Sequence, residues 1–493
     1  MSYSIPEILE IIKQQATSEF PIYLVGGALR DVLLGKNSRD LDFVVKNESI
    51  NFARRIADQA NGDFFILDNQ RGTARVLINT HTQERIILDF STLQGGSLEQ
   101  DLRSRDFTIN AMAAEVNSLE KIIDLFGGKQ DIAAKVLRAC SQKSFIDDPV
   151  RVLRALRLSQ ELGFSLLPET KKYLRKAVIH LSQVSIERQR DELFYILGGE
   201  GISNTLEEMQ EFGILNQLLP ELANLVGLQQ SDQVGDDAWT HTLMAVNYFQ
   251  SILQVLLYEE EYEGNNALLK TALDRLISFR RSLQVYFSES VNPIRPLISQ
   301  VFFAAIYHDV GKYPSRTIDE VGKFHFLDHH INGGDIVRLR AKVLALSNEE
   351  VDFIERTVRI HMEIHLWQKD PALDVNRAIH RYFKSAGKAG VSAAVFSLAD
   401  LLAANKGNVK PERWEFGLEM VERILDAWFN HFQEIVNPSL LLNGNEIIDE
   451  FTLQAGPLIG DLLAGLGEEQ AAGTLTDRRQ ALAWIQKQLD QGY

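Results

Sequence analysis

Two aspartates stand shortly after a glycine pair near the start of the chain, and their spacing suits metal-assisted chemistry on phosphates. Gly26 and Gly27 follow one apolar run, and Asp40 and Asp42 open the next. In a strand, alternate side chains share a face, so both carboxylates would lie together while Leu41 points into the core. Paired carboxylates bind Mg²⁺, and glycine N–H groups at a helix N-terminus can receive phosphate. The pattern therefore predicts a site for Mg²⁺ and a nucleoside triphosphate.

Alternating strand and helix signals surround this site and predict a small mixed α/β domain. Strands are expected at 21–25, 41–45, 64–67, 73–78 and 85–90, and helices at 28–34 and 51–59. From about Asp148 onward, helical periodicity replaces the strand pattern and no later strand is expected. A helix over 151–162 has Pro149 in its first turn and Gly163 just past its end, so both of its boundaries are signalled.

Composition and charge limit the class of protein and its partners. The 493 residues are 45% hydrophobic with only 12 prolines, which excludes a disordered chain. No apolar run approaches the roughly 20 residues of a membrane helix, so no membrane partner is expected. A single cysteine, Cys140, excludes an internal disulfide and predicts a cytoplasmic location. The net charge is −16, yet residues 135–190 hold twelve Lys and Arg against five acids. This segment is either a polyanion-binding surface or a solvated helical face.

Five motifs in order along the chain resemble one family, the class II tRNA nucleotidyltransferases and bacterial poly(A) polymerases of the DNA polymerase β superfamily. Residues 25–45 resemble motif A, 105–113 motif B, 124–131 the motif C hinge, 147–157 motif D and 187–192 motif E. The resemblance implies transfer of nucleotides from CTP or ATP to a tRNA 3′ end, with Mg²⁺ as cofactor and release of pyrophosphate. Two positions depart from the family: Asp147 replaces a glutamate, and Ser104 replaces the first arginine of motif B.

The resemblance also assigns roles to individual residues. The catalytic group comprises Asp40 and Asp42, and Asp89, by its place on the strand before motif B, is either a third acid of this group or an ordinary edge carboxylate. The expected nucleotide-binding residues are Gly26, Gly27, Arg30, Arg105, Asp106, Asn110, Asp148, Arg151, Arg154 and Arg157. Asp148 and Arg151, three apart on one expected helix, would read the incoming base, because a carboxylate and a guanidinium complement the donor and acceptor edge of cytosine and adenine. Alternatively, the pair is a helix-capping aspartate with a salt bridge.

The length of the segment before motif B bears on which nucleotides are added. CCA-adding members carry a longer stretch there, including a flexible loop, whereas only fifteen residues separate Asp89 from Arg105. Family members that lack this loop tend to be CC-adding. The sequence therefore predicts a CC-adding enzyme that needs a separate A-adding enzyme acting on the same tRNA. Full CCA addition and poly(A) polymerase activity stay open as alternatives.

A second ordered series of polar residues lies in the C-terminal half and resembles the HD metal-dependent phosphohydrolase domain. The ligand positions implied by that resemblance are His241, His308, Asp309, His329, His361 and Asp400. Imidazole and carboxylate ligands suit a divalent transition metal that activates water. A chain that is chiefly an HD phosphohydrolase with a vestigial head, and an RNA-binding scaffold, are alternatives from other functional classes.

These observations together predict a four-part organisation. The expected fold class is an α/β polymerase β-like nucleotidyltransferase domain followed by an all-α neck and a helical HD domain. Residues 1–140 form the head, 141–225 a helical neck that binds the base and RNA, 226–436 the HD domain and 437–493 a helical tail.

Overall fold

The structure is a computed structural model that describes residues 4–80, 85–230, 237–262, 264–290 and 295–491. The chain divides into two compact units, Met1–Ser185 and Ile186–Tyr493. This division falls within the predicted neck, and the finer four-part organisation stays a prediction.

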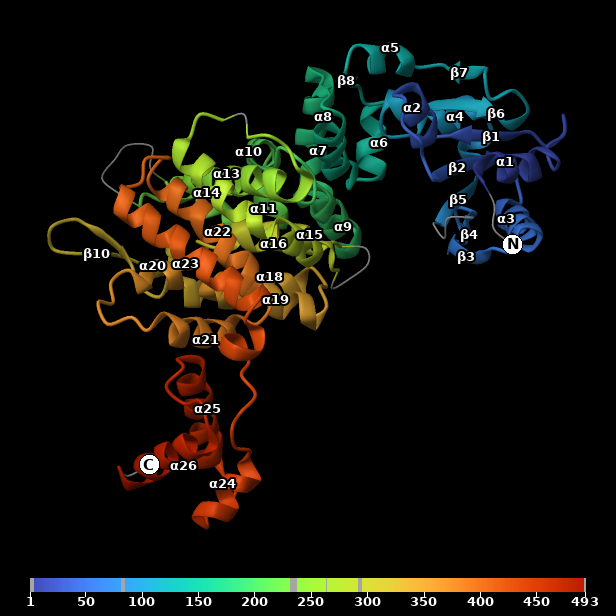
Figure 1. The fold of residues 1–493 in the computed structure, drawn as a ribbon. Coiled ribbons are helices and arrows are strands. Elements are labelled where there is room, and N and C mark those ends of the chain that lie inside the picture. The colour runs from blue at the N-terminus through green and yellow to red at the C-terminus, as the bar shows by residue number, and fades with distance from the viewer. Residues whose placement is uncertain (1–3, 81–84, 231–236, 263, 291–294, 492–493) are drawn as a thin grey trace. The chain divides into compact units, whose positions relative to one another are not determined.

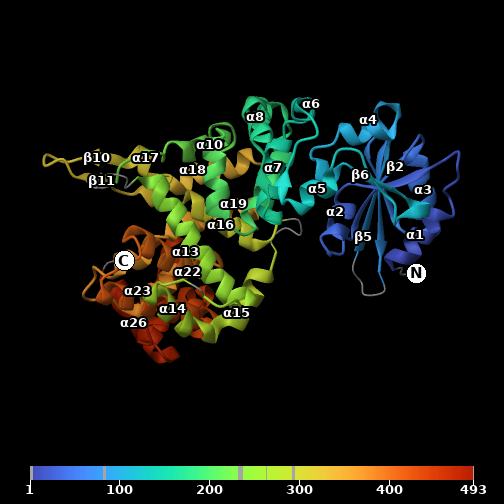
Figure 2. The same ribbon diagram turned by 90° about the horizontal axis from the view of Figure 1, so that it is seen from above.

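The first unit contains a mixed sheet (Figure 2). Among the described residues, its strand order is β3-β4-β5-β2-β1-β6-β7. Its strands are β1 (Ile22–Val25), β2 (Asp40–Val45), β3 (Asp63–Asp68), β4 (Thr73–Asn79), β5 (Arg85–Thr92), β6 (Met112–Glu115) and β7 (Ile122–Asp124). Its helices are α1 (Ile5–Lys13), α2 (Gly27–Leu33), α3 (Ser49–Ala60), α4 (Leu98–Arg103), α5 (Gly128–Ala133), α6 (Gln142–Asp147), α7 (Arg151–Leu162) and α8 (Pro168–Ala177). Strands β2 and β5 pair in parallel, and the other neighbours in this sheet are antiparallel.

Residue alternation in β2 places Leu41 and Phe43 on a packed face of the sheet and the two aspartates on the opposite face, here called the polar face, where an apolar cluster that includes Val25 and Val44 adjoins them. Leu41 and Phe43 are buried, whereas Asp40 is exposed and Asp42 is half-buried. On the packed face, Phe43 stacks on Phe90 with ring centroids 5.2 Å apart, and Phe52 of α3 contacts the same ring edge-on. Aromatic burial on one face thus fixes the register of β2 and leaves its aspartates on the other face.

The predicted strands and helices of the first unit are confirmed with small shifts at their ends. Helix α7 spans the expected residues 151–162, and Gly163 ends it with a φ of +65°. Pro149 lies before this helix rather than in its first turn. Strands β6 and β7 were not predicted, because their short apolar sequences carry no clear alternation. The additional pair β8 (Val136–Leu137) and β9 (Ser165–Leu166) places a strand after residue 148, where none was expected.

The second unit is helical, as predicted, around the buried helix α22 (Ala389–Ala404), which packs against α13 (Ala238–Tyr258), α19 (Asn348–Ile360) and α23 (Pro411–Phe429). The remaining longer helices are α9 (Ile186–Leu197), α10 (Ile202–Glu211), α14 (Ala267–Leu276), α15 (Arg280–Ser288), α16 (Leu297–Tyr307), α18 (His329–Val343), α21 (Val375–Ala386), α24 (Gly444–Phe451), α25 (Pro457–Ala471) and α26 (Arg478–Asp490) (Figure 1). The unit also contains the unpredicted hairpin of β10 (Arg316–Ile318) and β11 (Phe324–Phe326).

Helix α22 is almost entirely buried by its neighbours because its sequence is apolar on every side. Among the described residues, no single helix has both the length and the apolar composition to cross a membrane. The bent pair α21 and α22, at 111° to each other, meets that test only when the two helices are taken together.

Candidate functional site

Strand pairing brings three carboxylates together on the polar face of the sheet in the first unit. Asp42 of β2 lies directly beside Asp89 of β5 in the parallel register. Asp40, two residues earlier on β2, shares their face. One oxygen from each of the three carboxylates lies within 4.8 Å of the others, which is close enough for one divalent ion to contact all three. The structure thus places Asp89 beside the aspartate pair, as the sequence predicts.

The glycine pair has a steric role that the sequence analysis did not anticipate. Gly26 precedes α2 with φ +78° and ψ −147°, a conformation that favours glycine. A Cβ at this position would lie 2.5 Å from Oδ2 of Asp42 and 3.3 Å from Nη1 of Arg105. The absence of a side chain at Gly26 therefore lets the Asp42 carboxylate sit against the turn at the start of α2.

Burial and mutual repulsion make this group receptive to a cation. Burial raises the pKa of Asp42 to about 6, while Arg105 opposes the shift. Asp40 is exposed as a whole residue, but partial burial of its carboxylate also raises its pKa, and the nearby charge of Asp89 adds to the effect. Groups that resist carrying adjacent negative charges are stabilised by a divalent cation between them, so the residues fit the metal that the sequence predicts.

Arg75 is a polar contributor to this face that the sequence analysis missed. It lies on β4 directly opposite Asp89 of β5 and donates from Nε to Oδ1 and from Nη2 to Oδ2, both at 2.8 Å. Its neighbours Ala74 and Val76 are buried on the packed face. A charged residue between two buried apolar ones in a strand is a signal that could have identified it.

Four of the predicted nucleotide-binding residues form a chain of hydrogen bonds in the first unit. Arg30 of α2 donates from Nη1 to Oδ1 of Asn110 at 2.9 Å, and Asn110 donates to Oδ1 of Asp106 at 3.1 Å. Arg154 of α7 donates from Nε to Oδ2 of Asp106 at 2.6 Å. This chain connects the turn at Gly26 to helix α7, so these side chains fix the relative positions of the two elements.

The buried carboxylate of Asp106 predicts a pH-dependent stability for the first unit. Burial opposes its ionisation, but Arg154 and Arg151, with hydrogen bonds from Asn110 and the Phe107 N–H, lower its pKa to about 2. Because an unfolded aspartate titrates near pH 4, ionised Asp106 contributes about 2 kcal/mol above about pH 4, and this contribution disappears as the pH falls toward about 2. We expect Asp106→Asn to lack this dependence.

Hydrogen exchange of peptides from β6 and α7, corrected for the intrinsic effect of pH, measures this difference. Protection in the wild type is expected to fall between pH 5 and pH 3 more steeply than in Asp106→Asn. Parallel slopes for the two proteins would contradict the role of this carboxylate.

The expected base-reading pair is close together but does not share one helix, which corrects the sequence interpretation. Asp148 follows the end of α6 with φ −145° and ψ 86°, and α7 begins at Arg151. Nε of Arg151 lies 3.9 Å from Oδ2 of Asp148, and its Nη1 donates to the carbonyl oxygens of Ser104 and Ser144. Pro149 explains the break, because it disfavours helical backbone at the preceding residue. Arg157, farther along α7, pairs with Glu161 at 2.9 Å.

All six residues predicted from the HD resemblance meet in the interior of the second unit. The Nε2 atom of His241 lies 3.2 Å from Asp309 and 2.9 Å from Asp400, and His308 lies 3.2 Å from Asp309. On the other side of Asp309, its Oδ1 is 3.2 Å from Nε2 of His329 and 4.0 Å from Nε2 of His361. Asp309 therefore belongs to two sets of ligand atoms, each compact enough for one metal ion.

Two observations indicate that this cluster fits metal ions. Within the described residues, the buried Nε2 atoms of His329 and His361 form no hydrogen bond, although that of His329 lies 3.2 Å from Oδ1 of Asp309. Their Nδ1 atoms contact the backbone oxygens of Phe326 and Val358, which orients each ring toward Asp309. Buried imidazole nitrogens without partners are costly unless a ligand satisfies them.

The cluster also includes Lys312 and His365, which the sequence analysis did not assign. The Nζ atom of Lys312 lies 2.5 Å from Oδ2 of Asp309, and Nε2 of His365 lies 3.2 Å from Oδ2 of Asp400. Burial opposes ionisation of both aspartates, yet His308 and Lys312 keep the pKa of Asp309 well below its usual range. His365 lies on the separate short helix α20 (Glu363–Trp367), after the turn that follows α19, so its spacing from His361 was no signal for this contact.

Metal occupancy of this cluster predicts a measurable gain in stability. A metal at about a hundred times its dissociation constant stabilises the folded state by about 2.7 kcal/mol, so chelation lowers the melting temperature of the second unit. We expect His308→Ala to lose the bound metal, measured by elemental mass spectrometry, and to lose the response of Tm to chelator. Asp40→Asn is the control, because it leaves this cluster intact; an equal loss in both variants would contradict the assignment.

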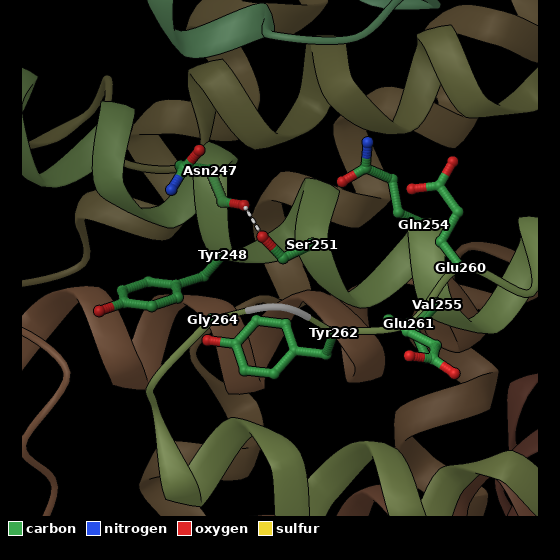
Figure 3. A pocket seen from close by; sticks show the side chains of 9 residues that line it. All are labelled: Asn247, Tyr248, Ser251, Gln254, Val255, Glu260, Glu261, Tyr262 and Gly264. Carbon is green, nitrogen blue, oxygen red and sulfur yellow. Dashed lines mark hydrogen bonds between the residues drawn. The ribbon is translucent and has the colours of Figure 1, made fainter.

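A separate cavity of about 650 Å³ lies beside α13 in the second unit (Figure 3). Its lining consists of Asn247, Tyr248, Ser251, Gln254, Val255, Glu260, Glu261, Tyr262 and Gly264. The tyrosine and glutamate side chains give it a polar wall, and it contains none of the predicted site residues.

Three protein families match segments of this chain, and two of these segments contain most residues of the two clusters. Residues 22–138 match the "Poly A polymerase head domain", residues 163–225 the "Probable RNA and SrmB- binding site of polymerase A", and residues 287–405 the "HD domain". The families of the polymerase head domain and of the HD domain are metal-dependent. His241 lies outside the matched HD segment, but α13 brings it into contact with Asp309.

Curated relatives cover most of the chain. A CC-adding tRNA nucleotidyltransferase of Thermus thermophilus is 29% identical over 95% of each chain, and an A-adding tRNA nucleotidyltransferase of Deinococcus radiodurans is 29% identical over 94% of each. A Multifunctional CCA protein of Neisseria gonorrhoeae is 31% identical over 70% of this chain and 74% of its own.

Solved structures share the fold. A CCA-adding enzyme in complex with ATP superimposes with a TM-score of 0.63 at 19% identity, covering 99% of this chain and 96% of the other. From the family matches, the relatives and the clustered carboxylates together, we conclude that the chain is a nucleotidyltransferase and belongs to the family of tRNA nucleotidyltransferases and poly(A) polymerases that carry an HD domain.

Proposed function

We propose that this enzyme adds cytidines to the 3′ end of tRNA and leaves the terminal adenosine to a separate A-adding enzyme. One observation carries the choice of CC addition. Between Asp89 and Arg105, the chain forms the end of β5, the single turn Gln94–Gly96 and α4, and no more than one residue lies outside these elements at any point. The chain therefore lacks room for the longer loop of CCA-adding relatives. The A-adding relative is as similar as the CC-adding one, so similarity alone does not favour either activity.

The proposed roles follow from the geometry of the first unit. Asp40 and Asp42 hold Mg²⁺, which supplies charge neutralisation on the phosphates of the incoming nucleotide. The turn at Gly26, with Arg105 beside it, receives the triphosphate. Asp148, just after α6, and Arg151, the first residue of α7, offer an acceptor and a donor for the amino group and ring acceptor of cytosine. Arg30, Asp106, Asn110 and Arg154 keep the turn and α7 in register.

Incubation of the purified enzyme with a tRNA lacking its CCA end tests the proposal. With labelled CTP we expect two cytidines to be added, and with CTP and ATP together we expect no added adenosine. A complete CCA end would contradict CC specificity, and long adenosine tracts on arbitrary RNA would identify a poly(A) polymerase. Supplying an A-adding enzyme to the CC product is expected to complete the end.

We also propose a second activity, hydrolysis of phosphate esters, at the cluster around Asp309. It is favoured by the two ligand sets that share this carboxylate and by Lys312, which supplies a positive charge beside them for an anionic substrate. Opening of cyclic nucleotides to nucleoside monophosphates, or of a 2′,3′-cyclic RNA end to a terminal phosphomonoester, would support it if the reaction is lost in His308→Ala. Equal activity in the wild type and the variant would contradict it.

A further inference from the structure

The polar face of the sheet carries one row of side chains that crosses five neighbouring strands. In register, Phe65 of β3 lies beside Arg75 of β4, which lies beside Asp89 of β5 and then Asp42 of β2. Val25 of β1 continues the row next to Asp42. Directly paired residues point to the same face, so the guanidinium and the two carboxylates are consecutive members of one row.

Arg75 and Asp89 form a bidentate ion pair, here called the fork, and this pairing distinguishes Asp89 from Asp40 and Asp42. Both oxygens of Asp89 accept a hydrogen bond from the one guanidinium, in the planar geometry that arginine forms with carboxylates. The Asp89 side chain is 19% exposed, whereas Arg75 is 37% exposed. Within the part of the chain that the structure describes, Asp40 and Asp42 have no comparable arginine partner. The fork leaves Asp89 with unused lone pairs, yet it fixes the plane of the carboxylate and offsets its charge.

We propose that Arg75 is a positioning residue of the nucleotidyltransferase site: it holds Asp89 in one orientation against the metal-binding aspartates and neutralises it, so that Asp40 and Asp42 dominate metal binding. Two separate effects follow. Neutralisation limits metal affinity, because a third uncompensated carboxylate would bind the ion more tightly. Orientation supports turnover, because a rotating carboxylate disturbs the arrangement that the reaction needs. This inference rests on the proposed role of Asp40 and Asp42.

Substitutions at Arg75 separate charge from orientation. We expect Arg75→Ala to increase the affinity for Mn²⁺, used as the probe ion, about tenfold and to lower kcat for CMP incorporation about tenfold. Arg75→Lys retains the charge but not the fork, so we expect it to restore the wild-type affinity while kcat stays low. Arg71→Ala is the matched control, because Arg71 forms an exposed ion pair with Asp68 in the adjacent turn.

Mn²⁺ binding is measured by calorimetry for each protein with and without Asp42→Asn. Subtracting the two titrations removes the Mn²⁺ that binds at the cluster around Asp309. In the double variant Arg75→Ala/Asp89→Asn, we expect kcat to fall no further than in the worse single variant, because both changes remove the same oriented carboxylate. Additive losses, unchanged affinity in Arg75→Ala, or full rescue of kcat by lysine would overturn the inference. If Asp42→Asn retained full activity, the proposed site itself would fail instead.

Discussion

Asp42→Asn is expected to reduce the rate of CMP incorporation at least about a thousand-fold, because it removes a charged ligand from the proposed metal site, beside the turn proposed to receive the triphosphate. The amide is nearly isosteric with the carboxylate, so the contact with Gly26 is retained and the fold is expected to persist. Single-turnover incorporation of labelled CTP onto tRNA lacking its CCA end measures the effect. The substitution is expected to leave tRNA affinity, measured by filter binding, within about twofold of the wild type, because Asp42 lies on the sheet face and not on the basic segment.

His308→Ala serves as the control for this experiment, because it changes a buried polar cluster in the other unit. We expect it to retain CMP incorporation. Near-normal incorporation by Asp42→Asn would exclude the carboxylates of the sheet as the metal site and would favour the alternative in which the HD cluster carries the main activity. Loss of incorporation in His308→Ala would show that the two clusters are not independent.

Asp148→Ala is expected to lower the preference for CTP over UTP about a hundredfold, measured as the ratio of kcat/KM values. Asp148 accepts from the amino group of cytosine in the proposed arrangement, and uracil presents a carbonyl oxygen there, which leaves buried polar groups unpaired. Without the carboxylate, that penalty against uracil disappears. CTP incorporation is also expected to slow, because Arg151 loses its partner at 3.9 Å.

Asp147→Ala provides the matched control for base selection. Asp147 is the adjacent acid, but its side chain is 55% exposed and pairs with Lys143 on α6. We expect it to leave the CTP to UTP ratio unchanged. A similar loss of discrimination in both variants would indicate a general effect on the start of α7, and unchanged discrimination in Asp148→Ala would exclude its role as the base-reading acceptor.

Features that depend on neighbouring residues in the chain were predictable from the sequence. Alternation in β2 separates Asp40 and Asp42 from Leu41, because the side chains of a strand point to opposite faces at every step. Gly163 ends α7 where expected, because a left-handed residue stops a helix with little strain in glycine. The two resemblances supplied the rest of the expected site residues, and they contained no information about distances between segments.

Features that depend on long-range pairing follow only from the tertiary structure. Arg75 faces Asp89 because β4 pairs with β5 in one register, and a shift of one residue would place this guanidinium on the packed face. His365 reaches Asp400 from another helix, across 35 residues of chain. Local periodicity states which face a side chain occupies within its own element, but contacts between elements depend on packing and register, which no short segment specifies.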